Sequence, residues 1–349
     1  MRYKLLGRTG LFISELGLGT DTFGGQTKRW ETFGALGRVQ ATEMVGEAIN
    51  AGVNLIDTAD TYGDGEAEIR VGQALQDLAI ARSEVILVTK VSDRVGPAPN
   101  AVGASRSHIL NGIEASLRRL GTDYIDLYLI HQFDPATPLD ETLRALDMLV
   151  RQGKVRYVGC SNFFAWQVAL ALGVSERDRF SRFAAVEASY TIAAREVERE
   201  LIPMLLNQEI GLIVWGGLAY GLLTGKYGRD GSAPEVGRLN SSVSVSSAHT
   251  NRERAFNAVD AMRPIAGRRG VSIAQIAIAW LLQQKGVTSV LLGTRLVSQL
   301  RDNLGAIDIR LSEEELAELG KPGALPIEYP AWMQNSRAIA RHPGQKNYD

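Results

Sequence analysis

Residues 17–22 read Gly-Leu-Gly-Thr-Asp-Thr and overlap the end of a predicted first strand, residues 13–19. An open doubly wound sheet that binds a dinucleotide would carry Gly-x-Gly-x-x-Gly between this strand and the next helix. Here Thr22 takes the place of the third glycine, and a long loop, residues 23–38, follows instead of a helix. A Gly-x-x-x-x-Gly-Lys-Ser/Thr phosphate loop is absent as well. The sequence therefore argues against a Rossmann-type sheet.

Short apolar runs alternate with helical segments along the rest of the chain. After residues 13–19, the runs lie at residues 53–56, 85–88, 125–130, 155–158, 184–186, 212–215 and 287–292. Most are continuous and β-branched, which is typical of strands buried on both faces of a parallel sheet. Apolar residues recur at helical spacing within residues 67–78, 109–120, 139–150, 197–205 and 273–281. This alternation predicts an α/β protein, and we expect a closed (β/α)8 TIM barrel.

The chain length fits one barrel with additions. A barrel takes about 250 residues, and the chain has 349. We predict a single domain over residues 1–349, made of an N-terminal β-hairpin (1–13), the barrel (14–320) and an irregular tail (321–349) packed across the fold. The surplus length falls mainly in the ends and in the loops 23–38 and 228–250, where we expect substrate choice to be determined.

Composition narrows the class of protein. The formal net charge is −1, with 38 basic and 39 acidic residues, so no nucleic-acid partner is expected. One cysteine excludes an internal disulfide, and four scattered histidines argue against a metal site. The N-terminus lacks a signal-peptide pattern, and the glycine-rich apolar stretch 210–224 is shorter than a membrane span. We expect a cytoplasmic protein with no membrane partner.

Polar residues follow three consecutive predicted strands, where the active sites of barrels collect. Asp57 and Tyr62 follow residues 53–56, Lys90 follows residues 85–88, and His131 follows residues 125–130. A lysine ammonium beside Tyr62 would lower the pKa of the phenol from its usual value near ~10 and help it to donate a proton. Asp57 would keep Lys90 charged. His131 would orient a carbonyl oxygen.

Each of these residues also has an ordinary structural interpretation. Asp57 suits a turn or a cap, Tyr62 suits packing, and His131 suits a satisfied core histidine. Lys90 is harder to explain in this way, because lysine is rarely buried without a partner. The combination of the four residues, in this order on successive strands, favours an acid–base site.

Longer motifs around these residues resemble the aldo-keto reductase family. They are residues 6–11 (LGRTGL), 54–59 (NLIDTA) with Tyr62-Gly63, Thr89-Lys90, 126–131 (DLYLIH) and 153–163 (GKVRYVGCSNF). The resemblance covers nearly the whole chain, up to Asn303. It implies a (β/α)8 barrel, a nicotinamide cofactor bound without a Rossmann domain, and a catalytic tetrad of Asp57, Tyr62, Lys90 and His131.

The resemblance also implies how the nicotinamide end of the cofactor is held. Ser161 and Asn162 would hydrogen-bond the carboxamide, although either could instead cap a helix. Glu187 stands where many members have glutamine, so it can accept from the carboxamide but cannot donate. Trp215 would stack on the ring, the alternative being a buried core tryptophan. After Trp215, glycines replace the Ser-Pro-Leu of many relatives, and backbone amides there would contact the pyrophosphate.

At the adenine end, Arg295 precedes a predicted helix and would pair with a 2′-phosphate. Gln299 and Asn303, four and eight residues after Arg295 and so on one face, would lie against the base. The alternative is a solvated polar face. An arginine here favours NADPH, with NADH as the alternative cofactor. The predicted cofactor-binding residues are Thr20, Asp21, Ser161, Asn162, Glu187, Trp215, Gly216, Gly217, Leu218, Gly221, Lys226, Gly293, Thr294, Arg295, Gln299 and Asn303.

The leading functional hypothesis is reversible reduction of a small-molecule aldehyde or ketone to an alcohol, with Tyr62 as the proton donor. A second is a nicotinamide-binding regulatory subunit on the same fold, as in the channel-associated β subunits that resemble this family. A third, a Schiff-base aldolase using Lys90, leaves the cofactor pattern unexplained. Aromatic candidates for the substrate site are Trp30, Phe33, Phe133 and Trp332. The substrate, the direction and the oligomeric state stay open.

Overall fold

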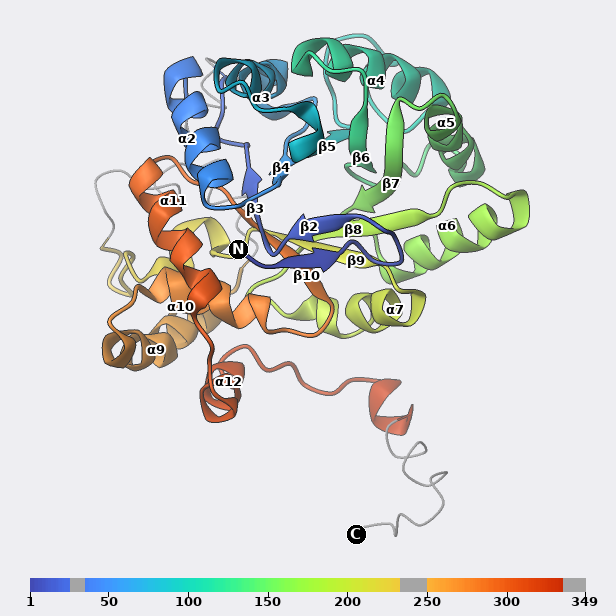
Figure 1. The fold of residues 1–349 in the computed structure, drawn as a ribbon. Coiled ribbons are helices and arrows are strands. Elements are labelled where there is room, and N and C mark those ends of the chain that lie inside the picture. Colours follow the sequence, from blue (N-terminus) through green and yellow to red (C-terminus); the bar gives the residue numbers. More distant parts are fainter. Residues whose placement is uncertain (26–34, 233–249, 335–349) are drawn as a thin grey trace.

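A computed structural model describes residues 1–25, 35–232 and 250–334 (Figure 1). Strands β1 (Tyr3–Leu5) and β2 (Phe12–Ser14) form the predicted antiparallel hairpin, with Tyr3 opposite Ser14. In its turn Gly7 has a φ of +55°, and a Cβ there would lie 2.7 Å from the Glu209 carbonyl oxygen, so only glycine fits. The hairpin therefore packs against the N-terminal ends of the barrel strands.

Eight parallel strands close into a barrel in the order β10-β3-β4-β5-β6-β7-β8-β9, which confirms the predicted TIM barrel. They are β3 (Leu16–Gly19), β4 (Leu55–Asp57), β5 (Ile86–Val91), β6 (Ile125–Ile130), β7 (Val155–Ser161), β8 (Phe183–Ser189), β9 (Gly211–Trp215) and β10 (Val287–Leu292). Leu6 and Ile13 of the hairpin segment are fully buried and pack with side chains inside the barrel, such as Leu127. This packing closes the end of the barrel opposite the polar strand ends.

Helices surround the barrel (Figure 1). They are α2 (Arg38–Asn50), α3 (Glu66–Asp77), α4 (Arg106–Leu120), α5 (Leu139–Arg151), α6 (Ala165–Asp178), α7 (Leu201–Gln208), α9 (Arg252–Arg269), α10 (Ile273–Leu282), α11 (Val297–Leu304) and α12 (Glu313–Gly320). Short 3-10 turns are η1 (Tyr62–Gly65), η2 (Arg82–Glu84), η3 (Glu196–Glu198), η4 (Ala219–Thr224) and η6 (Gly305–Asp308).

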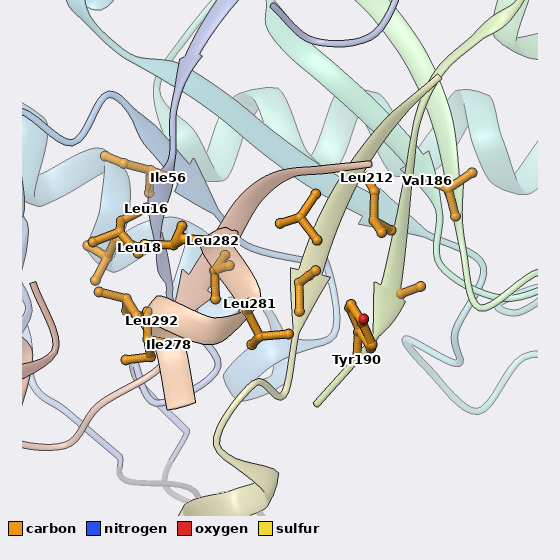
Figure 2. Packing of buried hydrophobic residues seen from close by; sticks show 14 of the residues in the cluster. Leu16, Leu18, Ile56, Val186, Tyr190, Leu212, Ile278, Leu281, Leu282 and Leu292 are labelled. Carbon is orange, nitrogen blue, oxygen red and sulfur yellow. The ribbon is translucent and has the colours of Figure 1, made fainter. Parts of the chain in front are cut away.

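The main hydrophobic core lies between the helices and the outer face of the barrel. Helix α10 begins after Ser272, whose side chain accepts from the Gln275 amide. It packs Ile278, Leu281 and Leu282 among buried strand residues such as Leu292 (Figure 2). Truncating one of these side chains to alanine would cost about 2–5 kcal/mol of stability.

Two predicted elements differ from the structure, and helix α9 was not predicted. The predicted strand 13–19 is divided, because the Ser14 hydroxyl donates to the Leu16 carbonyl and the barrel strand begins only at Leu16. The predicted helix 197–205 begins at Leu201, and Pro203 falls in its first turn, where a missing N–H costs no helical hydrogen bond. No helix was predicted at α9, because Pro264 lies inside it and its mean hydropathy is low.

The tail differs from its prediction as well. In residues 321–334, Ile327, Tyr329 and Trp332 are 55–75% exposed, and this segment leads away from the barrel (Figure 1). The prediction of a tail packed across the fold is therefore wrong for these three side chains, although Gly323 is buried and Glu328 pairs with Arg199 at 2.9 Å. Among the described residues no single helix meets the length and apolarity of a membrane span, although α9 and α10 meet it as a bent pair.

Candidate active site

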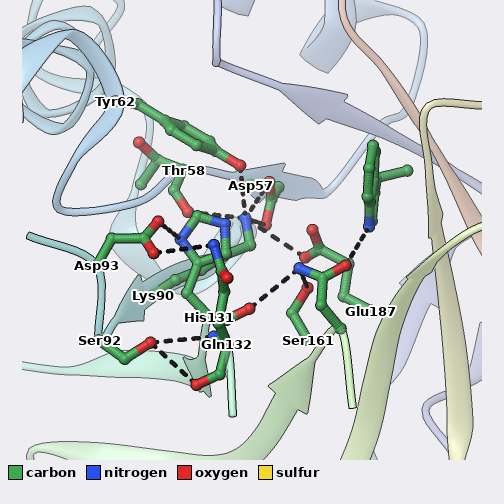
Figure 3. A network of polar contacts seen from close by, with 12 residues as sticks. Asp57, Thr58, Tyr62, Lys90, Ser92, Asp93, His131, Gln132, Ser161 and Glu187 are labelled. Atoms are coloured by element: carbon green, nitrogen blue, oxygen red, sulfur yellow. Dashed lines mark hydrogen bonds and ion pairs between the residues drawn. The ribbon is translucent and has the colours of Figure 1, made fainter. Parts of the chain in front are cut away.

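The four predicted acid–base residues meet at the C-terminal ends of β4, β5 and β6 (Figure 3). Lys90 is fully buried, and its Nζ donates to Asp57 Oδ2 at 2.6 Å and Oδ1 at 2.7 Å. The same ammonium donates to the Thr58 carbonyl at 3.1 Å and lies 3.4 Å from the Tyr62 hydroxyl. The Tyr62 ring meets the His131 ring edge-on, with centroids 5.8 Å apart. Lys90 thus joins the phenol to the carboxylate.

The charges of this cluster decide its protonation. Burial alone lowers the pKa of Lys90, but the carboxylates of Asp57 and Glu187 outweigh burial and hold that pKa well above its ordinary value. Burial raises the pKa of Tyr62, and the neighbouring Lys90 ammonium only partly offsets this rise. The expected lowering of the Tyr62 pKa is therefore wrong for the protein alone, because burial is the larger effect. Tyr62 keeps its proton and Lys90 keeps its charge at neutral pH.

Asp93 joins the site, and the sequence patterns did not identify it. Its Oδ2 lies 2.9 Å from His131 Nδ1, and its Oδ1 accepts from Gln132 Nε2 at 3.1 Å (Figure 3). Ser92 places Asp93 just beyond β5 with an unusual φ of +126°. A contact at Nδ1 sets the orientation of the imidazole ring and leaves its other nitrogen on the opposite edge. The sequence signal that could have identified Asp93 is its position, a carboxylate three residues after Lys90 at the end of a strand.

Ser161, Asn162, Glu187 and Trp215 gather beside this cluster. Asn162 Nδ2 donates to Ser161 Oγ at 3.0 Å and to the His131 carbonyl at 3.1 Å, while its Oδ1 accepts from Trp215 Nε1 at 3.2 Å. The backbone of Asn162 has a φ of +59°, which asparagine tolerates better than most residues. Helix α6 begins at Ala165 after Phe164, so the helix-cap interpretation of Ser161 and Asn162 is excluded.

One cavity of about 1090 Å³ runs from this cluster to α11. Every predicted cofactor residue lines it, as do Asp57, Tyr62 and His131. Arg295, just before α11, and Lys226 line it, as does the buried carboxyl of Glu187 beside the acid–base cluster. Cationic side chains and a polar cluster along one cavity fit a long dinucleotide with anionic phosphates.

The Gly-rich segment after β9 follows the wall of the cavity. Gly216 and Gly221 have φ values of +68° and +91°, and a Cβ on Gly221 would lie 3.0 Å from Lys226 Nζ. The glycines therefore keep the backbone close to the cavity and leave room for the lysine. Arg295 lies just before α11, as predicted, and its amide donates to Gln299 Oε1 at 3.3 Å.

The two aromatic substrate candidates that the structure describes, Phe133 and Trp332, do not line the cavity. Phe133 packs edge-on against Phe163 at 5.3 Å and also contacts Trp166, and neither it nor Trp332 lines the cavity. Trp332 is 55% exposed on the outlying tail segment. Trp30 and Phe33 lie outside the described residues. Among the described residues, Leu36, Gln132 and Leu218 line the cavity instead.

Comparisons with known proteins agree with this geometry. Residues 15–321 match the model of the Aldo/keto reductase family. A probable voltage-gated potassium channel subunit beta of Arabidopsis thaliana is 36% identical over 312 residues, which cover 88% of this chain and 92% of that protein. The protein of the same description from Oryza sativa subsp. japonica has the same identity and coverage. The versiconal hemiacetal acetate reductase of Aspergillus parasiticus is 32% identical over 339 residues, 92% of this chain and 97% of that protein.

Proposed function

The chain belongs to the aldo/keto reductase family, and from this we propose that it is an NADP(H)-dependent oxidoreductase. In this proposal it reduces an aldehyde or ketone to an alcohol, or catalyses the reverse reaction. The observation that carries the proposal is the fully buried Lys90, which joins Asp57 to the Tyr62 hydroxyl at one end of the long cavity.

Each residue of the site would have a separate role in this reaction. Bound nicotinamide would supply the hydride. Tyr62 would donate its proton to the carbonyl oxygen as negative charge develops there, and the Lys90 ammonium would stabilise the resulting phenolate. Asp57 keeps that ammonium in place. His131, oriented through Asp93, would help to hold the carbonyl oxygen, while Ser161 and Asn162 would bind the carboxamide.

A regulatory role is the second candidate, because two relatives are described as probable voltage-gated potassium channel beta subunits. A Schiff-base aldolase is not supported, since a nucleophilic lysine needs a lowered pKa and Asp57 and Glu187 raise that of Lys90. The deciding assay follows the loss of nicotinamide absorbance with a panel of aldehydes and ketones. Turnover would support the reductase. Cofactor binding without turnover would favour the regulatory role, and borohydride trapping of a carbonyl on Lys90 would contradict both.

Arg295→Ala is expected to weaken NADPH binding by about tenfold to a hundredfold, because a charge-assisted contact to a phosphate is lost. NADH lacks that phosphate, so its affinity should stay nearly unchanged. Cofactor fluorescence titrations measure both dissociation constants. Arg301→Ala is the matched control: Arg301 lies on α11 but pairs with Glu47 at 2.8 Å and does not line the cavity. Equal loss of NADH and NADPH affinity would contradict the assignment.

Asp93→Ala is expected to lower kcat/KM about tenfold, because the imidazole of His131 loses the partner that orients it. Cofactor affinity should not change. Asp93→Asn keeps an oxygen that can lie beside Nδ1 and should restore much of the activity, which a merely structural effect on the loop would not predict. Steady-state kinetics across pH and a cofactor titration provide the measurement. Wild-type kinetics in Asp93→Ala would remove Asp93 from the positioning of His131.

A further inference from the structure

Glu187 brings a second buried carboxylate to the Lys90 ammonium. Its side chain is 3% exposed, and its Oε2 lies 3.4 Å from Lys90 Nζ (Figure 3). Asp57 already contacts the same nitrogen through both oxygens, at 2.6 and 2.7 Å. Three strands, β4, β5 and β8, therefore place two acids and one base in a single buried cluster. If all three groups are ionised, this cluster carries one excess negative charge.

Glu187 also faces the part of the cavity where the carboxamide residues lie. It is in register with Ser161 on the neighbouring strand, and its carbonyl accepts from the Asn162 amide at 3.2 Å. Both neighbours line the same cavity as Glu187 and Trp215. A ring held between Trp215 and these polar side chains would lie beside the Glu187 carboxyl.

The surroundings of Glu187 shift its pKa in opposite directions. Burial raises the pKa of Glu187 well above its ordinary value, and the Asp57 carboxylate adds to this rise, while the Lys90 ammonium opposes it. Tyr62 of η1 also faces the cluster, and Glu187 helps to raise the pKa of that phenol. A new positive charge in the adjoining cavity would favour the ionised form of Glu187.

We propose that Glu187 makes cofactor binding sensitive to redox state, so that the site favours oxidised nicotinamide over reduced nicotinamide more than a glutamine would. This rests on the proposed function, since it requires a nicotinamide in the cavity. The oxidised ring is a cation and the reduced ring is neutral, so the carboxylate distinguishes them by Coulomb attraction in a poorly solvated site. Glutamine has nearly the same shape without the charge. Binding of the oxidised form therefore draws a proton from the Glu187 carboxyl, and the proton is released to solvent.

The sign of the pH dependence follows from linkage. The cation favours ionised Glu187, so affinity for NADP⁺ rises with pH through the pKa of this carboxyl and is constant above it. Affinity for NADPH lacks this contribution. The 2′-phosphate titrates in both cofactor forms and cancels in the ratio of the two dissociation constants. The ratio of the NADPH constant to the NADP⁺ constant is expected to rise about tenfold, which corresponds to a pKa shift of about one unit.

Glu187→Gln tests the charge without changing the shape of the side chain. Both cofactor forms are titrated over the whole pH range in which the protein stays folded. In the variant the ratio should be independent of pH and about tenfold less favourable to NADP⁺ at high pH. Calorimetry of NADP⁺ binding in two buffers of different ionisation enthalpy should show proton release from the wild-type protein only. Glu176→Gln, an exposed change on α6, is the matched control.

The outcomes separate the inference from the proposed function. Retained NADPH affinity in Glu187→Gln shows that the variant is folded. If both forms bind and the ratio is the same in wild type and Glu187→Gln, the inference is overturned while cofactor binding stands. If the wild-type protein binds no nicotinamide form, the proposed function fails together with the inference.

Discussion

Tyr62→Phe is expected to lower kcat for carbonyl reduction by about three orders of magnitude, within the range typical of a lost general acid. The change removes only the hydroxyl that lies 3.4 Å from Lys90 Nζ. The ring should keep its edge-on contact with His131, so the site should retain its shape. Cofactor affinity is therefore expected to change little. Steady-state and single-turnover kinetics with NADPH, together with a cofactor titration, provide the measurement.

A second phenol supplies the control for this experiment. Tyr190 is also buried, and its hydroxyl donates to Glu198 Oε1 at 2.5 Å, outside the cavity. Tyr190→Phe removes the same atom and should leave kcat unchanged. Retention of most activity in Tyr62→Phe would assign proton donation to another group of the site, such as His131 or Lys90. Loss of cofactor affinity in Tyr62→Phe would instead indicate a binding role for the phenol.

The fold was predictable because its main signals are local. Buried parallel strands are continuous apolar runs, and two of them, residues 125–130 and 287–292, were predicted with the bounds seen in β6 and β10. The absence of the third glycine at Thr22 separated a barrel from an open sheet. The predicted bounds that were wrong depend on single interactions with the backbone. One example is the hydrogen bond from the Ser14 hydroxyl to the Leu16 carbonyl, which divides the first predicted strand.

Grouping of the site residues was predictable because parallel strand ends meet at one edge of the barrel. The distances between individual side chains at that edge could not be predicted. Asp93 was missed because only the folded loop after β5 brings it to His131, and the contact between Glu187 and Lys90 joins strands 97 residues apart in the chain (187 − 90). The direction of the Tyr62 pKa shift depends on a balance of burial against charge that spacing does not contain.

Lys90→Met should have the largest effect on stability, lowering the free energy of unfolding by about 3–5 kcal/mol. The reason is that Asp57 and Glu187 would remain buried without the cation that both contact. Activity should fall at least as far as in Tyr62→Phe, because the phenol also loses its neighbouring charge. Urea denaturation measures the stability. Lys285→Met, an exposed change, is the control.

The pH dependence of Lys90→Met distinguishes this electrostatic cause from a simple packing defect. Burial raises the folded-state pKa of Glu187 above its unfolded value, so the folded state holds a proton that the unfolded state releases. Stability from such a group is complete below the unfolded pKa and is lost as pH rises through the folded pKa. Without Lys90 this loss should grow, so the free energy of unfolding of the variant should fall more steeply with rising pH than that of the wild type. Adding Asp57→Asn to Lys90→Met removes one of the two buried negative charges and should restore part of the stability. A double-mutant cycle measures this effect. A destabilisation that is independent of pH and not relieved by Asp57→Asn would mean that Lys90 stabilises the barrel by packing alone.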